Sequence, residues 1–178
     1  MKIKILNLLI VFLVAITASC QTNKTKIMEI HSSNFRNNEM IPSKFTCDGM
    51  NVSPALSWSG APATVKSFAL VCDDPDAPMG TWVHWVLFNI PSTITRLNEN
   101  FLIKTKPFKE ITAGINDFSQ LDYGGPCPPG GTHRYFFKLY ALDTFLDARE
   151  GITADQLVSV MEGHIVGKAE MVGKYRRK

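Results

Sequence analysis

The stretch that decides the fold class is Gly124–Leu142, with the sequence GGPCPPGGTHRYFFKLYAL. Its second half, Tyr135–Leu142, is an almost unbroken run of aromatic and aliphatic residues, which is typical of a β-strand. A run this apolar predicts a central strand that is covered on both faces. Its first half is rich in glycine and proline, which interrupt regular structure. The stretch therefore predicts a stiff loop that leads into a buried strand.

Three further runs have the aromatic and β-branched composition of strands. They are Ile27–Ser32, Ser67–Cys72 and Val83–Ile90. Proline and glycine are scattered between them, which favours many short connections and an all-β domain. One connection, Pro91–Pro126, is long enough to indicate a functional or topological role.

One helix is predicted near the carboxyl end of the chain. Thr153 and Gln156 have the spacing of a capping box, in which each side chain bonds the backbone of the other residue. The apolar stripe that follows has helical spacing and consists of Leu157, Val160, Met161, His164 and Ile165. Within this stripe, His164 is interpreted as a packed, hydrogen-bonded core histidine. Beyond Gly167 the pattern does not distinguish a helix from a strand.

The first 19 residues have the pattern of a secretory signal. Lys2 and Lys4 precede the apolar run Ile5–Ile16, which is too short to span a bilayer and is followed by small residues and Cys20. A cysteine at this point resembles a bacterial lipobox, although Thr17 stands where an aliphatic residue is usual. We therefore expect a signal peptide at 1–19, a lipidated Cys20 with a tether over 20–26, and one domain at 27–178. Ordinary cleavage that leaves Cys20 unmodified is the alternative.

The charge of the chain limits its partners. The composition is 45% hydrophobic and 20% charged, which is ordinary for a globular domain. Removal of residues 1–19 takes away two lysines and no acid, so the formal net charge falls from +3 to +1. A chain this close to neutral lacks the basic surface of a nucleic-acid binder, and no such partner is expected. We expect an exported protein that its lipid holds on the periplasmic face of a bacterial membrane.

A second unusual segment runs from Asp73 to Trp85, with the sequence DDPDAPMGTWVHW. Three acids and two prolines at its start predict a stiff, exposed loop, because proline fixes its own backbone and restricts the residue before it. In the strand that follows, alternation places Trp82 and His84 on one face and Val83 and Trp85 on the other.

The two unusual segments together predict a binding pocket. Alternation puts His133 and Tyr135 on one face of their strand, with Arg134 on the other. If the strands are neighbours, both histidines, Tyr135 and a carboxylate such as Asp74 converge on one cavity. Imidazole and phenol groups supply hydrogen-bond donors, and a carboxylate can orient a histidine and favour its charged form. The arrangement predicts a pocket for a small anion such as a phosphate ester.

The prolines and cysteines of these segments carry further expectations. A cis proline marks a tight turn, so we expect at least one cis bond among Pro75, Pro78, Pro128 and Pro129. Cys47 and Cys127 both lie in turn-rich segments, and disulfides persist in exported proteins, but their spacing does not decide whether they pair. Cys72 ends an apolar run and is expected to be a buried thiol.

Both segments closely resemble the signature regions of the phosphatidylethanolamine-binding protein family, also called Raf kinase inhibitor-like proteins. Phe45–Trp58 and Met161–Tyr175 resemble its bacterial and archaeal branch. The resemblance covers Ile27–Arg176 and implies a Greek-key β-sandwich with a C-terminal helix and a small anion pocket. It implies that Arg134 pairs with a carboxylate such as Asp76. The ligand-binding residues that it implies are Asp74, Asp76, Trp82, His84, Gly125, Cys127, Pro128, Pro129, His133 and Tyr135.

We expect a binding protein that is not an enzyme and needs no cofactor, because the segments supply donors without a recognisable catalytic triad. One alternative is a metal-dependent hydrolase that uses His84, His133 and Asp74, since two histidines and a carboxylate can hold a metal. Another is a protease or kinase inhibitor that acts through surface loops, for which Leu97–Phe118 is long enough. A thiol-based activity of Cys127 is a third. A protein partner and a homodimer stay open.

Overall fold

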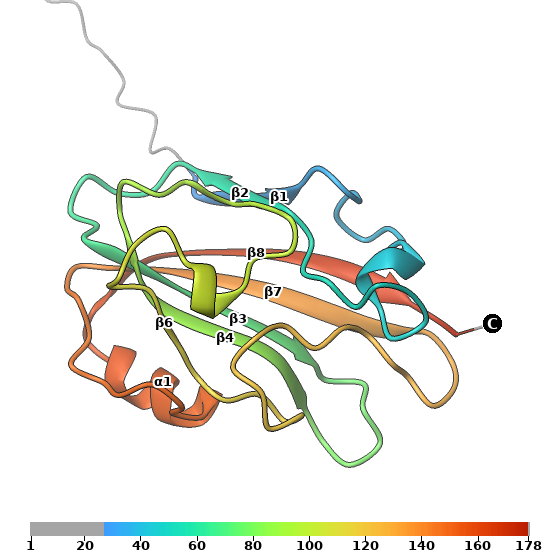
Figure 1. Cartoon of the computed structure of the whole chain (residues 1–178). Coiled ribbons are helices and arrows are strands. Elements are labelled where there is room, and N and C mark those ends of the chain that lie inside the picture. The colour runs from blue at the N-terminus through green and yellow to red at the C-terminus, as the bar shows by residue number, and fades with distance from the viewer. Residues whose placement is uncertain (1–26, 178) are drawn as a thin grey trace, which may run out of the picture.

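The computed structural model describes residues 27–177, and Figure 1 shows how their strands are layered. The strands of this part of the chain form two antiparallel sheets with the orders β1-β2-β5 and β6-β4-β3-β7-β8. The smaller sheet consists of β1 (Glu29–Ser32), β2 (Leu56–Ser59) and β5 (Arg96–Leu97). The larger sheet consists of β3 (Ser67–Asp74), β4 (Trp82–Pro91), β6 (Thr112–Ala113), β7 (His133–Leu142) and β8 (Ile165–Tyr175). The predicted all-β sandwich is confirmed.

Each face of the larger sheet packs against its own hydrophobic cluster. The first cluster fills the space between the sheets and includes Leu56, Phe68 and Leu139. The second lies between the larger sheet and helix α1 (Ala154–Met161), and includes Val71 and Leu157. Successive side chains of β3 enter the two clusters in turn, which explains why the whole strand is buried.

The strand Tyr135–Leu142 is central but is covered less completely than expected. β7 lies between β3 and β8, and its inward residues are buried in the first cluster. Its outward residues Phe136, Lys138 and Tyr140 are only partly buried. The prediction of cover on both faces is wrong for β7 and holds instead for β3. The hydrophobic cluster under α1 includes Val71 of β3 but not Phe136 of β7.

Several strand boundaries differ from those expected. The other three predicted strands exist, but β1 begins at Glu29, β3 continues to Asp74 and β4 runs from Trp82 to Pro91. β2, β5 and β6 were not predicted, since each has only two to four residues. The open question beyond Gly167 is answered by β8, an 11-residue strand. Two short 3-10 helices, η1 (Ser43–Phe45) and η2 (Ile103–Thr105), lie in the connections.

Helix α1 begins as predicted and ends earlier. The Thr153 hydroxyl accepts the Gln156 N–H at 3.3 Å and the Gln156 amide oxygen accepts the Thr153 N–H at 3.0 Å, which confirms the capping box. The helix stops at Met161, and Gly163 turns the chain with a φ of 80°. The interpretation of His164 as a core residue is therefore wrong: its exposed ring lies 3.0 Å from Asp143.

The predicted signal peptide and lipidated tether, residues 1–26, lie outside the described residues. Among residues 27–177, no helix is both long and apolar enough to cross a membrane.

Candidate functional site

A β-bulge in β4 positions the first histidine. Cys72 pairs with Trp85 and Asp73 pairs with Val83, so His84 is the extra residue on β4. The bulge turns two consecutive side chains to one face: Trp85 packs in the cluster between the sheets, and His84 contacts Tyr135 of that cluster. The predicted alternation is correct for His84 and Val83. It is wrong for Trp85, because it assumed a regular strand.

The structure brings both histidines to one small cavity of about 210 Å³. The strands β4 and β7 are not neighbours as the simplest prediction required, because β3 lies between them (Figure 1). β3 ends at Asp74, which places this carboxylate in the cavity next to His133. The residues that line the cavity are Asp74, Ala77, Pro78, Trp82, His84, Phe118, Cys127, Pro128, Pro129 and His133.

His133 is held by a buried carboxylate. Its Nδ1 lies 2.7 Å from Oδ2 of Asp74, and the two side chains are only 8% and 5% exposed. The other oxygen of Asp74 accepts the backbone N–H of Asp76 at 2.9 Å. Both carboxylate oxygens therefore accept hydrogen bonds from the protein, and the proton of His133 is fixed on Nδ1 when the ring is neutral.

His84 is held by a backbone carbonyl. Its Nδ1 lies 2.6 Å from the carbonyl oxygen of Gly124, which can only accept, so Nδ1 carries the proton. The edges of the ring also contact the rings of Phe118 and Tyr135. Burial lowers the pKa of His84 below its usual value, and the Gly124 carbonyl and nearby carboxylates oppose this effect.

Three of the predicted site residues do not line the cavity and support it instead. Tyr135 is fully buried next to His84, and this burial, together with the nearby charge of Asp74, raises the pKa of its hydroxyl. Asp76 forms a two-pronged pair with Arg134, at 2.7 and 2.8 Å, which lowers the pKa of Asp76 to about 2. The predicted pairing of Arg134 is confirmed. The N–H of Gly125 donates to Asn51 at 2.7 Å.

A disulfide ties one wall of the cavity to a distant loop. Cys127 is bonded to Cys47, with 5.4 Å between their Cα atoms, and the N–H of Cys47 donates to the carbonyl of Pro126 at 3.1 Å. This answers the question that the sequence left open. Cys127 therefore has no thiol, which removes the thiol-based alternative. Cys72 is the expected buried thiol, and burial raises its pKa.

The expected cis proline is absent, because the described part of the chain contains no cis peptide bond. Hydrogen bonds and a glycine make the turns instead. The N–H of Asp76 donates to the Asp74 side chain, and the N–H of Gly80 donates to the carbonyl of Ala77 at 3.2 Å. Gly80 itself has a φ of 104°, which glycine tolerates. These bonds reverse the chain with all prolines trans.

Sequence reasoning missed three lining residues. Ala77 and Pro78 belong to the quoted acidic and proline-rich segment and were passed over in favour of its charged groups. Phe118 lies in the long connection, where no local pattern marks it. Its position depends on Asn116, whose side-chain oxygen accepts the N–H groups of Phe118 at 3.0 Å and Gln120 at 2.9 Å.

The donor set does not favour a metal site. Within the described residues, no group of three or more histidine, cysteine or acidic side chains is arranged to hold a metal ion. Both oxygens of Asp74 already accept hydrogen bonds, one from His133 and one from the N–H of Asp76. The alternative of a metal-dependent hydrolase is therefore not favoured.

Comparisons with known proteins agree on one family. The family model described as phosphatidylethanolamine-binding protein matches residues 31–176. A UPF0098 protein of Methanothermobacter thermautotrophicus is 50% identical over 150 residues, which cover 84% of this chain and 99% of the relative. A UPF0098 protein of Aquifex aeolicus is 46% identical over 154 residues, which cover 85% of this chain and 90% of the relative.

Two solved structures have the same architecture. The first is a crystal structure described as a putative phosphatidylethanolamine-binding protein homolog, CT736 from Chlamydia trachomatis. It matches with a TM-score of 0.80 and 37% identity, over 86% of this chain and 99% of that chain. The second is the crystal structure of E. coli YbcL, described as a new member of the mammalian PEBP family. It matches with a TM-score of 0.79 and 33% identity, over 85% of this chain and 99% of that chain.

Proposed function

The chain belongs to the phosphatidylethanolamine-binding protein family, and on that premise we propose that it binds a small anion, such as a phosphate ester, in the cavity between His84 and His133. One observation carries the proposal. Two buried imidazoles line the same small cavity, and each has its Nδ1 proton fixed by an acceptor of the protein.

The fixed Nδ1 protons determine what the rings offer a ligand. When an imidazole is neutral and protonated on Nδ1, its Nε2 is an acceptor and repels an anion. When the ring takes up a second proton, Nε2 becomes a charged donor, which makes a stronger hydrogen bond to an oxyanion than a neutral donor does. Anion binding is therefore coupled to proton uptake by the histidines.

The charge and size of the cavity support a small ligand. Asp74 is only 3% exposed and both its oxygens accept bonds from the protein, so its negative charge is already compensated when His133 is protonated. The volume of about 210 Å³ lies below the range of roughly 300–1,000 Å³ that is usual for drug-sized ligands. The cavity therefore suits a phosphate or head group, with the rest of the ligand outside.

We propose binding without catalysis. The lining residues include no serine, threonine, lysine or tyrosine, and Cys127 has no thiol because it is bonded to Cys47. The carboxylate of Asp74 is occupied by two hydrogen bonds, which leaves it poorly suited to attack a ligand.

Calorimetry tests this proposal. O-phosphorylethanolamine is titrated into the wild type, His133→Ala and a control, His164→Ala, which removes an exposed histidine that pairs with Asp143 outside the cavity. We expect His133→Ala to weaken binding at least about tenfold, because one charged donor is lost. We expect the control to bind like the wild type. Equal affinity of His133→Ala and the wild type would refute the assignment.

The N-terminal sequence supports a second, separate proposal: the protein is exported and held at the periplasmic face of a membrane by a lipid on Cys20. Labelling of expressing bacteria with a clickable palmitate analogue should mark the wild type and fail to mark Cys20→Ser. Labelling of both proteins, or of neither, would contradict lipidation at this residue.

A further inference from the structure

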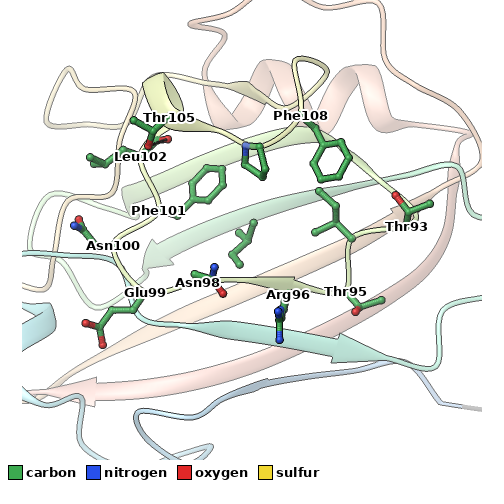
Figure 2. Close-up of a pocket in the computed structure, with 13 residues that line it drawn as sticks. Thr93, Thr95, Arg96, Asn98, Glu99, Asn100, Phe101, Leu102, Thr105 and Phe108 are labelled. Carbon is green, nitrogen blue, oxygen red and sulfur yellow. Dashed lines mark hydrogen bonds between the residues drawn. The ribbon is translucent and has the colours of Figure 1, made fainter.

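A second hollow is separate from the anion cavity. It has a volume of about 550 Å³ and shares no lining residue with that cavity. We call it the cleft. One side of the cleft is the extended segment 93–98, which contains β5, and the other is the segment 101–108, which we call the strap (Figure 2). In Figure 2 the rings of Phe101 and Phe108 lie between the strap and β5.

The cleft exposes the free edge of a sheet. β5 is the last strand of the order β1-β2-β5, so only one of its edges is paired. The carbonyl of Thr95 accepts the N–H of Trp58 at 2.9 Å, and Leu97 is opposite Leu56. Because the peptide groups of successive strand residues point in opposite directions, those of Arg96 and Asn98 point away from β2. Neither the N–H nor the carbonyl of Asn98 has a backbone hydrogen-bond partner within residues 27–177.

Part of the wall of the cleft is apolar. Ile94 and Leu97 are buried at its base, whereas Phe108 is 41% exposed on the strap. Large exposed aromatic side chains beside a concave surface are typical of binding sites. An unpaired strand edge next to apolar side chains is the arrangement that binds extended peptides by strand addition.

The surroundings of the cleft are basic. Segment 93–110 contains Arg96, three lysines that do not line the cleft, and two acids, of which only Glu99 lines it. That acid already pairs with Lys44. Lys104 on the strap and Lys109 directly after it are exposed. A negatively charged occupant complements these basic side chains, and a positively charged occupant is disfavoured.

We propose that the cleft binds an extended acidic segment of a partner protein, in which apolar residues alternate with acids. The segment adds to the free edge of β5 as a further strand. Its backbone pairs with the peptide groups of Arg96 and Asn98, its apolar side chains face the wall with Phe108, and its acids lie near the lysines of the strap. Because the cleft and the anion cavity have separate linings, this proposal stands or fails independently of phosphate binding.

A fluorescent acidic peptide, acetyl-EVDVEVD-amide, tests the proposal by anisotropy with the purified domain. We expect it to bind, and we expect alternate N-methylation of its backbone to weaken binding at least about tenfold, because strand addition needs the peptide N–H groups. The basic peptide acetyl-KVKVKVK-amide should not bind. Equal binding of the N-methylated peptide, or no binding of the acidic peptide, would overturn the proposal.

Two exposed phenylalanines provide a matched pair of variants. Phe108→Asp should weaken the acidic peptide about tenfold or more, and Phe145→Asp, which alters a similarly exposed ring outside the cleft, should not. Circular dichroism of both variants checks that they are folded. In addition, the backbone amide signals of Arg96 and Asn98 should shift when the peptide is added. Displacement of the peptide by octanoate with these amides unmoved would identify the occupant as an amphiphile and overturn the peptide proposal.

Discussion

His84 makes the anion affinity of the cavity depend on pH. Burial lowers its pKa, so the ring is mostly neutral at pH 7 and its Nε2 is an acceptor. The affinity for sulfate, whose charge is constant in this range, should therefore rise as the pH falls from 7.5 to 5.5. We expect up to about a tenfold change per pH unit for each proton taken up. Calorimetry at several pH values measures it, and His84→Gln should show a flatter dependence.

The same shift affects folding with the opposite sign. The unfolded chain protonates His84 more readily than the folded protein does, because the pKa is lowered on folding. The contribution of His84 to the stability of the unliganded protein is therefore full above about pH 6.5 and is lost as the pH falls below it. For the binding prediction, an affinity for sulfate that rises with pH would contradict the role given to the His84 ring.

Asp74 stabilises the fold through the two donors that it accepts. An asparagine offers one acceptor and one donor, so Asp74→Asn leaves either His133 or the N–H of Asp76 without an acceptor. We expect a loss of about 1–3 kcal/mol in the free energy of unfolding. Asp143→Asn is the matched control, because it alters an exposed aspartate–histidine pair, and it should lose at most about 1 kcal/mol. Urea denaturation of both variants measures these losses. Equal losses would show that the buried pair stabilises the fold no more than the exposed pair does.

At the scale of elements, the loop 116–122 forms one wall of the site. The side-chain amide of Asn116 donates to the carbonyls of His84 at 3.1 Å and Asp122 at 2.8 Å, while its oxygen orients Phe118. Asn116→Ala should lower the free energy of unfolding by about 2–4 kcal/mol, because several buried groups lose their partners. It should also weaken anion binding by displacing Phe118. Denaturation and calorimetry measure both, and unchanged anion affinity would show that Phe118 is not part of the site.

The sequence predicted elements where local rules dominate and failed where distant contacts decide. The capping box at Thr153 is a local pattern, and it was confirmed. The bulge at His84 results from the pairing of β4 with β3, which no pattern within β4 reveals, so the face of Trp85 was predicted incorrectly. The end of α1 depends on Gly163 and on the pairing of β8 with β7, and the helical stripe was therefore extended too far.

At the scale of the whole molecule, the disulfide joins loops that are 80 residues apart. Loss of such a cross-link increases the entropy of the unfolded chain, and Cys47→Ser with Cys127→Ser should lower the free energy of unfolding by about 3–5 kcal/mol. Hydrogen bonds between the same loops remain, including the one from Gly125 to Asn51. We therefore expect the double variant to keep its fold and to bind anions more weakly. Denaturation tests the first effect, and stability equal to that of the wild type would contradict it.

The family resemblance in the sequence indicates most of the residues that line the cavity. Seven of the ten predicted ligand-binding residues line the cavity, since they belong to two motifs that β3 brings together. Tyr135, Asp76 and Gly125 do not line the cavity, and a motif alone does not show which of its members face it. The cleft was not predicted, since it depends on how the strap lies over β5.

The most direct test of the account is nitrogen NMR of the histidine rings at pH 6 during a titration with inorganic phosphate. The account predicts that His84, whose pKa is lowered by burial, gains a proton on Nε2 as phosphate binds, while its Nδ1 proton stays on its bond to Gly124. His164, outside the cavity, should show only the small response of an exposed ring. If phosphate leaves the Nε2 signal of His84 unchanged, the cavity does not bind anions through this histidine and the account is wrong.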